Sequence, residues 1–253
     1  MNIVNGIYGK TTKSIIKLVD GGRSNQSTPL KIGIFVSPGF MPMDINGAQS
    51  VFTIAAAEIY FIWKEKELVE GYIGWPTMPT MTFNDCPDDL DVLVVGMVPP
   101  EIVEDIEVLN FFKRIVPKTK YVIATCYGTL VLGAAGLLVG RRATSNSNVV
   151  PMLSDLDAIP VAGSDVIIDG NIYTSGPATG SFDASLLVLE QLKDTSFAQL
   201  VELAIEYDPR PPFKTGSPLL AGTELTAISQ SLTSSINQQY HQSAIKGFNL
   251  MRK

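Results

Sequence analysis

Residues 121–138 read YVIATCYGTLVLGAAGLL, and this stretch decides the fold class. Its first five residues are β-branched, aromatic or small, as in a buried strand, and the run after Gly128 is rich in Ala and Leu, as in a helix. Cys126 therefore lies in the turn between a strand and a helix. In such an elbow the backbone is sharply bent and the side chain is exposed above the sheet.

Two interpretations of Cys126 are open. Unpaired cysteines are often small buried core residues without chemistry. In the alternative, Cys126 is a nucleophile, because the following helix directs N–H groups and the positive end of its dipole toward the sulfur and so favours the thiolate. The place of Cys126 at the carboxyl end of a strand favours the nucleophile.

Strands and helices alternate along the rest of the chain. Strands are expected at residues 32–36, 60–63 and 91–96, and helices at 44–59, 101–118, 129–140, 179–193 and 196–207. Asp169-Gly170 stands between two apolar segments and predicts a β-hairpin. The alternation predicts an α/β protein with a flavodoxin-like, doubly wound, mostly parallel sheet that helices cover on both faces.

The sequence divides into three parts. Residues 1–30 include a linker-like run at 21–27 and are expected to form an N-terminal extension that is flexible or loosely docked. Residues 31–215 are expected to form the α/β domain, which ends at the proline-rich segment 208–212. Residues 216–253 are expected to form a helical tail, whose apolar stripe packs on its own domain or on a partner subunit. The stripe consists of Leu225, Ile228, Leu232 and Ile236.

The composition excludes several classes of protein. A net charge of −6 over 253 residues does not suit a dedicated nucleic-acid binder. No apolar run approaches the length of a bilayer span, so no association with a membrane is expected. Two cysteines do not form a disulfide framework, and we therefore expect a reducing compartment, the cytoplasm.

His241 is the single histidine of the sequence. It lies in the polar tail, so we expect it at the surface and not in a Ser-His-Asp or Cys-His arrangement with Cys126. One histidine and two scattered cysteines do not make a zinc site, and no metal or organic cofactor is expected. The acid–base partner of Cys126 is then expected to be a carboxylate.

Asp44 is the candidate for this carboxylate, because it is the only acid between the first strand of the domain and the helix that follows. A structural role is equally consistent with its position, since Asp often caps a helix or lies in its first turn. If the carboxyl group is instead buried beside the thiol, its pKa is raised, and it can act as a general acid near neutral pH.

Four stretches resemble the isonitrile hydratase branch of the ThiJ/PfpI (class I glutamine amidotransferase-like) superfamily. They are the elbow at 124–138, the loop at 39–47, the helix start at 179–187 and the segment at 205–213. The resemblance extends over about residues 31–220 and implies the fold predicted above, a small-molecule substrate and a homodimer, to which the striped tail helix offers apolar surface.

The resemblance also implies roles for individual residues. Cys126 would attack the carbon of an isonitrile while Asp44 protonates that carbon, and water would then hydrolyse the resulting thioimidate to an N-substituted formamide. Tyr127 is a third candidate catalytic residue. The residues expected to line the substrate site are Gly96, Met97, Gly128, Ser145 and Thr179.

Three positions depart from the pattern of these enzymes. Tyr127 stands in place of the usual threonine, Met97 in place of the second glycine of a Gly-Gly turn, and residues 145–147 (Ser-Asn-Ser) where many relatives have His or an aromatic residue. Two alternatives therefore stay open. One is a redirected Cys-dependent lyase or hydrolase or a glyoxalase-like enzyme, and the other is a non-catalytic, dimeric ligand-binding or redox-sensing protein.

Overall fold

The computed structural model describes residues 28–163 and 165–253, so most of the predicted N-terminal extension lies outside the described residues. The strands are β1 (Lys31–Phe35), β2 (Glu58–Trp63), β3 (Val69–Gly71), β4 (Trp75–Thr77), β5 (Met81–Thr82), β6 (Val92–Val95), β7 (Tyr121–Thr125), β8 (Arg142–Ala143), β9 (Ile159–Pro160), β10 (Ile167–Asp169) and β11 (Ile172–Ser175). The helices are α2 (Pro42–Ile54), α3 (Pro100–Val103), α4 (Ile106–Ile115), α5 (Gly128–Ala134), α6 (Gly180–Leu192), α7 (Thr195–Ala204) and α8 (Pro218–Met251), with 3₁₀ turns at Val116–Lys118 and Val150–Leu156.

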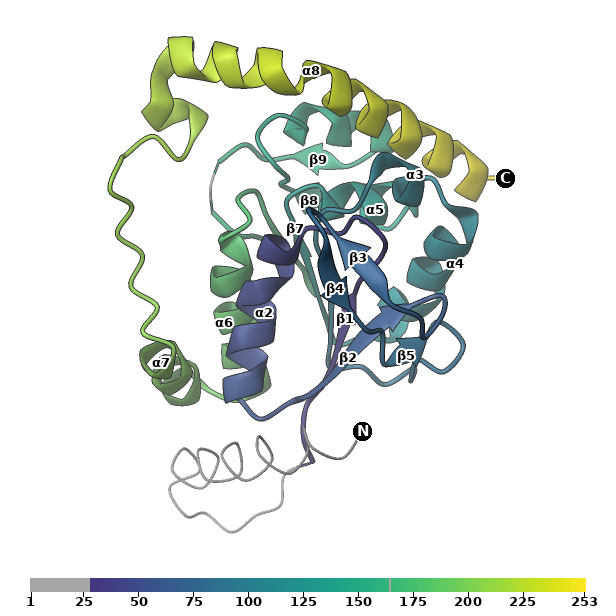
Figure 1. Cartoon of the computed structure of the whole chain (residues 1–253), viewed down its shortest axis with the longest axis vertical. Helices are drawn as coiled ribbons and strands as arrows, with labels where there is room; N and C mark the ends of the chain where they lie inside the picture. Colours follow the sequence, from purple (N-terminus) through teal and green to yellow (C-terminus); the bar gives the residue numbers. More distant parts are fainter. Residues whose placement is uncertain (1–27, 164) are drawn as a thin grey trace.

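The central sheet has seven strands in the order β10-β11-β7-β6-β1-β2-β5 (Figure 1). Every neighbouring pair is parallel except β10 and β11, which form the predicted hairpin with Gly170 at φ +60° in its turn. The five strands β2, β1, β6, β7 and β11 have the order of a flavodoxin-like sheet. The predicted doubly wound, mostly parallel fold is thus confirmed.

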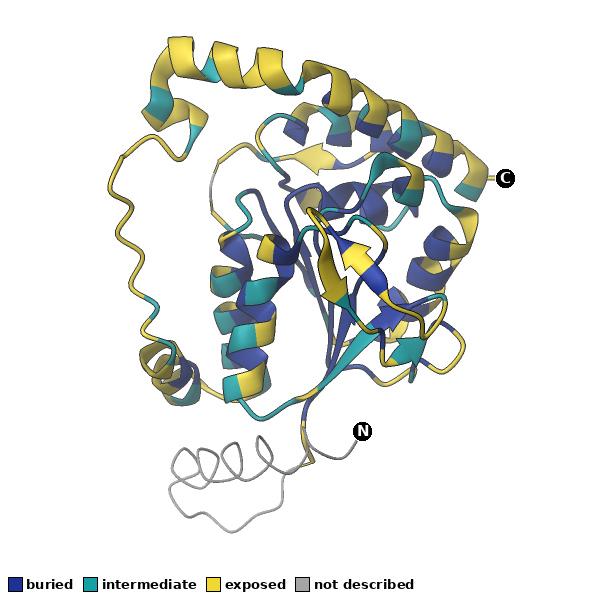
Figure 2. Cartoon of the chain, in the orientation of Figure 1, coloured by how far each residue is buried: buried dark blue, intermediate teal, exposed yellow. Residues whose placement is uncertain are grey.

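Helices cover both faces of this sheet (Figure 1). Helices α2 and α6 pack together, with α7 beside them, while α3, α4 and α5 lie together with α8. Strands between two helical layers must be apolar on both faces, and all four residues of β6 are buried (Figure 2). The carboxyl ends of β1, β6 and β7 meet at one edge of the sheet, where the topology places a ligand site.

The prediction of a single helix at 101–118 was wrong, because the helical structure is interrupted between α3 and α4. The Asp105 carboxylate accepts hydrogen bonds from the backbone N–H groups of Glu107 and Val108, at 3.0 and 3.1 Å. It therefore caps α4, which is the position that Asp favours over a helix interior.

The helix after Cys126 is also shorter than predicted, ending at Ala134 and not near Gly140. Gly136 has a φ of +74°, in the left-handed region that commonly ends a helix. A glycine two residues after the last helical residue thus stops α5 after seven residues.

The two halves of α8 differ in their surroundings. The half near its C-terminal end packs on α3, α4 and α5, and the other half extends away from the sheet and is mostly exposed (Figures 1 and 2). The predicted apolar stripe lies on the exposed half, with Leu232 at 80% exposure. Packing of this stripe against a second copy, and the homodimer itself, stay predictions. Neither α8 nor any other helix in the described part of the chain is both long and apolar enough to cross a membrane.

Candidate active site

Cys126 stands between β7 and α5 with a φ of +58°. This left-handed conformation costs a non-glycine residue roughly 1–2 kcal/mol, so the surrounding structure must hold it. The Cys126 N–H donates to the Ser175 carbonyl at 2.9 Å, and the Ser145 hydroxyl donates to the Cys126 carbonyl at 2.7 Å. The backbone thus has the sharp bend predicted for the elbow, held on both sides by hydrogen bonds.

Asp44 lies in the first turn of α2 and is 1% exposed. Its Oδ2 atom accepts a hydrogen bond from the Met97 N–H at 2.6 Å, and among the described residues its buried Oδ1 atom has no hydrogen-bond partner. The approach requires a glycine at position 96, because a Cβ atom on Gly96 would lie 2.5 Å from the Asp44 Cβ. This packing places the carboxyl group beside the Cys126 thiol.

Burial raises the pKa of the Asp44 carboxyl to about 7, although the hydrogen bond from Met97 and the contact with the Cys126 thiol oppose the shift. A carboxyl group with this pKa is protonated in about half of the molecules at neutral pH. Asp44 can therefore both donate and accept a proton under ordinary conditions, as a general acid–base group must.

The pKa of the Cys126 thiol is also raised, by burial first and by the negative charge of Asp44 second. The Tyr127 N–H and the Asn146 side chain oppose this shift. The start of the helix thus favours the thiolate through the Tyr127 N–H, as expected, but burial and the neighbouring acid outweigh this contribution. The two groups titrate as a pair that holds one proton between them above about pH 7.

Tyr127 is buried and faces α8. Its phenol O–H donates to Asn237 Oδ1 at 2.6 Å, and its ring centroid lies 4.4 Å from that of Tyr240. Burial raises the pKa of the phenol to about 12. The hydroxyl group is thus bound to a helix of the protein itself, and its proton is hard to remove.

The structure brings four of the five predicted substrate-site residues around the elbow. Met97 contributes its backbone N–H to Asp44, and Ser145 contributes its hydroxyl to the Cys126 carbonyl. A Cβ on Gly128 would lie 2.4 Å from the Val95 carbonyl oxygen, so this glycine lets α5 begin against the end of β6. Thr179 lies apart from these contacts, exposed at the start of α6.

Three residues at the site were not predicted. Asn146 directs its Nδ2 atom toward the Cys126 sulfur at 3.7 Å, and Asn237 and Tyr240 come from α8. Asn146 follows Ser145 within a segment that was singled out for departing from the family pattern. Asn237 and Tyr240 had no comparable signal, because they lie in a polar tail more than 100 residues from the elbow.

His241 lies away from the elbow, with its Nε2 atom 2.8 Å from Asp155 Oδ2. In residues 28–163 and 165–253, no three His, Cys, Asp or Glu side chains are grouped so that they could hold a metal ion.

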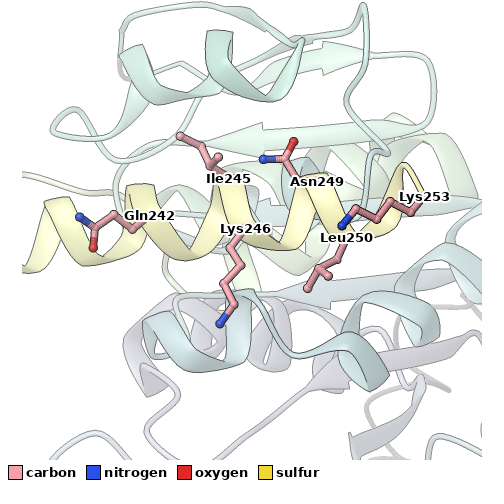
Figure 3. A pocket seen from close by; sticks show the side chains of 6 residues that line it. All are labelled: Gln242, Ile245, Lys246, Asn249, Leu250 and Lys253. Atoms are coloured by element: carbon pink, nitrogen blue, oxygen red, sulfur yellow. The ribbon is translucent and has the colours of Figure 1, made fainter.

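A surface hollow of about 470 Å³ lies along α8 (Figure 3). Five of the residues that line it belong to the last turns of that helix, Gln242, Ile245, Lys246, Asn249 and Leu250, and the sixth, Lys253, follows the end of the helix. None comes from the loops that carry Cys126 and Asp44, and Lys246 forms an ion pair with Glu104. The hollow offers no group suited to the chemistry of the elbow.

Comparison with known proteins agrees with this geometry. The chain is 38% identical to an isonitrile hydratase of Pseudomonas putida over 192 residues, which cover 75% of this chain and 83% of that enzyme. It is 26% identical to the deglycase PfpI of Pyrococcus furiosus, over 47% of this chain and 72% of that protein. The crystal structure of a THiJ/PfpI family protein from Pseudomonas syringae superposes with a TM-score of 0.82 at 31% identity, over 89% of this chain and 94% of that one.

The family assignment rests on the whole α/β domain as well as on the elbow. A model of the DJ-1/PfpI family matches residues 30–191, which include every strand of the central sheet, Asp44 and Cys126. The chain belongs to the DJ-1/PfpI family.

Proposed function

We propose that this protein is a hydro-lyase that adds water to a small isonitrile and releases an N-substituted formamide, with Cys126 as nucleophile and Asp44 as general acid and base. The proposal is supported by the similarity to isonitrile hydratase over most of the chain. One observation carries it further: a buried carboxyl group with a pKa of about 7 lies beside the thiol.

An isonitrile carbon has a lone pair and becomes electrophilic when it is protonated. In the first step Asp44 takes the thiol proton and delivers it to this carbon while the sulfur forms the C–S bond, giving a thioimidate and leaving Asp44 as a carboxylate. The one proton that the pair holds above about pH 7 is the one that this step consumes.

Water completes the reaction. The oxygen of water attacks the thioimidate carbon while Asp44 accepts a proton from that water. Asp44 then passes this proton to the imine nitrogen. The C–S bond then breaks as the carbonyl forms, and the hydroxyl proton returns to the Cys126–Asp44 pair. The sum is one isonitrile and one water converted to one formamide, without an oxidant, a reductant or a metal ion.

The test measures formamide production from a small alkyl isonitrile by the wild type, Cys126→Ala and Asp44→Asn. We expect formamide from the wild type only, together with a covalent adduct of one isonitrile on Cys126 when the reaction is quenched early. Wild-type protein that yields no formamide from a panel of alkyl and aryl isonitriles would contradict the proposal. Turnover of an α-oxoaldehyde or of its adducts under the same conditions would instead support a glyoxalase- or deglycase-like reaction.

A further inference from the structure

Helix α8 contacts the Cys126 elbow and the loop after β6, whose Met97 N–H binds Asp44, through two buried residues with polar groups. Asn237 is 7% exposed and Tyr240 is 3% exposed. Most polar side chains on this helix are exposed, so the burial of these two needs an explanation. Each has a hydrogen-bond partner at the elbow or at the loop after β6.

Asn237 binds the residue next to the nucleophile. Its Oδ1 atom accepts the Tyr127 phenol hydrogen at 2.6 Å, and its Nδ2 group donates to Thr233 Oγ1 at 3.0 Å. The Thr233 hydroxyl in turn donates to the Ser229 carbonyl at 3.0 Å, so its oxygen is free to accept from the amide. This chain of donors fixes the orientation of the Asn237 amide, and with it the Tyr127 side chain.

Tyr240 binds the loop that holds the acid. Its phenol O–H donates to the Val98 carbonyl at 2.8 Å. Val98 follows Met97, whose N–H is the hydrogen-bond donor to Asp44. The loop is therefore held from both ends, since the Met97 carbonyl also accepts a hydrogen bond from the Met41 N–H at 2.9 Å.

Close packing fixes the position of α8 on the domain. A Cβ atom on Gly247 would lie 2.9 Å from Leu109 Cδ1 and 3.0 Å from the Val103 carbonyl oxygen. The helix thus lies directly against α3 and α4, with Asn237 and Tyr240 held two to three turns before this contact. A helix seated in this way can transmit its position to both loops.

We propose that Asn237 and Tyr240 are positioning residues, which hold the Cys126 elbow and the Met97–Val98 loop at the separation that lets thiol and carboxyl share a proton. The inference rests on the proposed Cys/Asp chemistry but not on the identity of the substrate. Loss of the Tyr240 hydrogen bond frees the Met97 N–H to move away from Asp44. The carboxyl group then becomes more basic, so that a larger share of the paired proton resides on Asp44 and more Cys126 is thiolate.

Alkylation of Cys126 by iodoacetamide tests this without any substrate, with the modified residue identified by mass. Tyr240→Phe keeps the ring and removes one hydroxyl, and Tyr60→Phe is the matched control because it removes the phenol hydrogen bond to Glu58 at the surface. We expect Tyr240→Phe to raise the alkylation rate of Cys126 at pH 7 by about three- to ten-fold, as the weakening of one hydrogen bond allows, and Tyr60→Phe to leave it unchanged.

Asn237→Leu is the second variant, because it removes the acceptor of the Tyr127 phenol and keeps the branched shape and the number of side-chain heavy atoms. We expect a similar change in alkylation rate and, with isonitrile as substrate, a fall in kcat and little change in KM. Folding of each variant is checked by its thermal unfolding midpoint. Wild-type alkylation profiles in folded Tyr240→Phe and Asn237→Leu would overturn the proposal, whereas absence of hydration by the wild type would overturn the proposed function alone.

Discussion

The two cysteines of this chain are both buried and both unpaired, yet their surroundings differ. Burial raises the pKa of the Cys86 thiol to about 11, and it raises that of Cys126 as well. The Cys86 thiol donates a hydrogen bond to the Pro87 carbonyl, which is too weak a base to take the proton from the thiol. Cys126 has a carboxyl group with a pKa of about 7 beside it. A raised thiol pKa therefore does not distinguish the two cysteines, whereas the neighbouring acid supports Cys126 as the proposed nucleophile.

The largest expected difference is between the alanine variants of the two residues. Cys126→Ala removes the nucleophile, and we expect turnover to fall by on the order of 10⁴-fold or more, as when other covalent nucleophiles are removed. Cys86→Ala should keep activity within about two-fold and lose about 1 kcal/mol of stability, because a buried sulfur is lost from the core. Steady-state rates and unfolding midpoints of both variants check this, and equal losses of activity would remove the distinction.

Each cysteine has an aspartate near it, Asp44 beside Cys126 and Asp88 near Cys86. Replacing each acid by asparagine is therefore the next test. Asp44→Asn still accepts the Met97 N–H but cannot carry the proton, and we expect kcat to fall by about 10²- to 10⁴-fold with little change in KM. Asp88 raises the pKa of Cys86 but is an exposed carboxylate bound to Arg114 and Lys118. Asp88→Asn is the control, and its kcat should equal that of the wild type.

The pH dependence tests the shared proton. Below about pH 7 both Asp44 and Cys126 are protonated, and no base is present to take the thiol proton. We therefore expect kcat/KM to rise about ten-fold per pH unit up to a midpoint near 7 and then to level off. In Asp44→Asn this rise of kcat/KM with pH should be absent, whereas Asp88→Asn should keep it. A flat profile between pH 5 and 8 in the wild type would contradict the assigned pair.

Substitution of the residue that follows the cysteine is expected to have the smallest effect on kcat. Pro87 follows Cys86 and Tyr127 follows Cys126, but the Tyr127 hydroxyl is bound to Asn237 and its pKa is about 12. Tyr127→Phe should therefore lower kcat by only about three- to ten-fold, as expected for one lost hydrogen bond. A loss of 10²-fold or more would instead assign the phenol a proton-transfer role. Tyr127→Thr, assayed beside it, reports whether the ring limits the size of the site.

The sequence predicted the features that depend on neighbours along the chain. The β-branched run before Cys126, the Asp169-Gly170 turn and the alternation of strands and helices were enough for the sheet and the elbow. The position of Asp44 between the first strand and its helix made it a candidate, to which the family resemblance gave a role. The break before α4 was missed, because Asp105 reads equally well as a cap or as a residue in the first turn of one long helix.

Contacts between residues far apart in the sequence could not be predicted from neighbours along the chain. Asn237 and Tyr240 reach the elbow from a helix that looks polar in the sequence, and nothing local marks their partners. The burial of Cys86 likewise depends on such contacts, because a segment that is polar in the sequence lies against the core in the structure. The raised pKa of Cys126 depends on how deeply the elbow is covered, which the strand–turn–helix pattern does not specify.

The left-handed backbone of Cys126 has a consequence for the descent of this protein. At a φ of +58°, glycine would relieve roughly 1–2 kcal/mol of conformational cost that cysteine carries. A duplicated copy released from selection for activity gains stability from this single replacement, whereas serine or alanine would keep the cost. Glycine at position 126 is therefore the expected mark of a descendant that has abandoned the proposed chemistry.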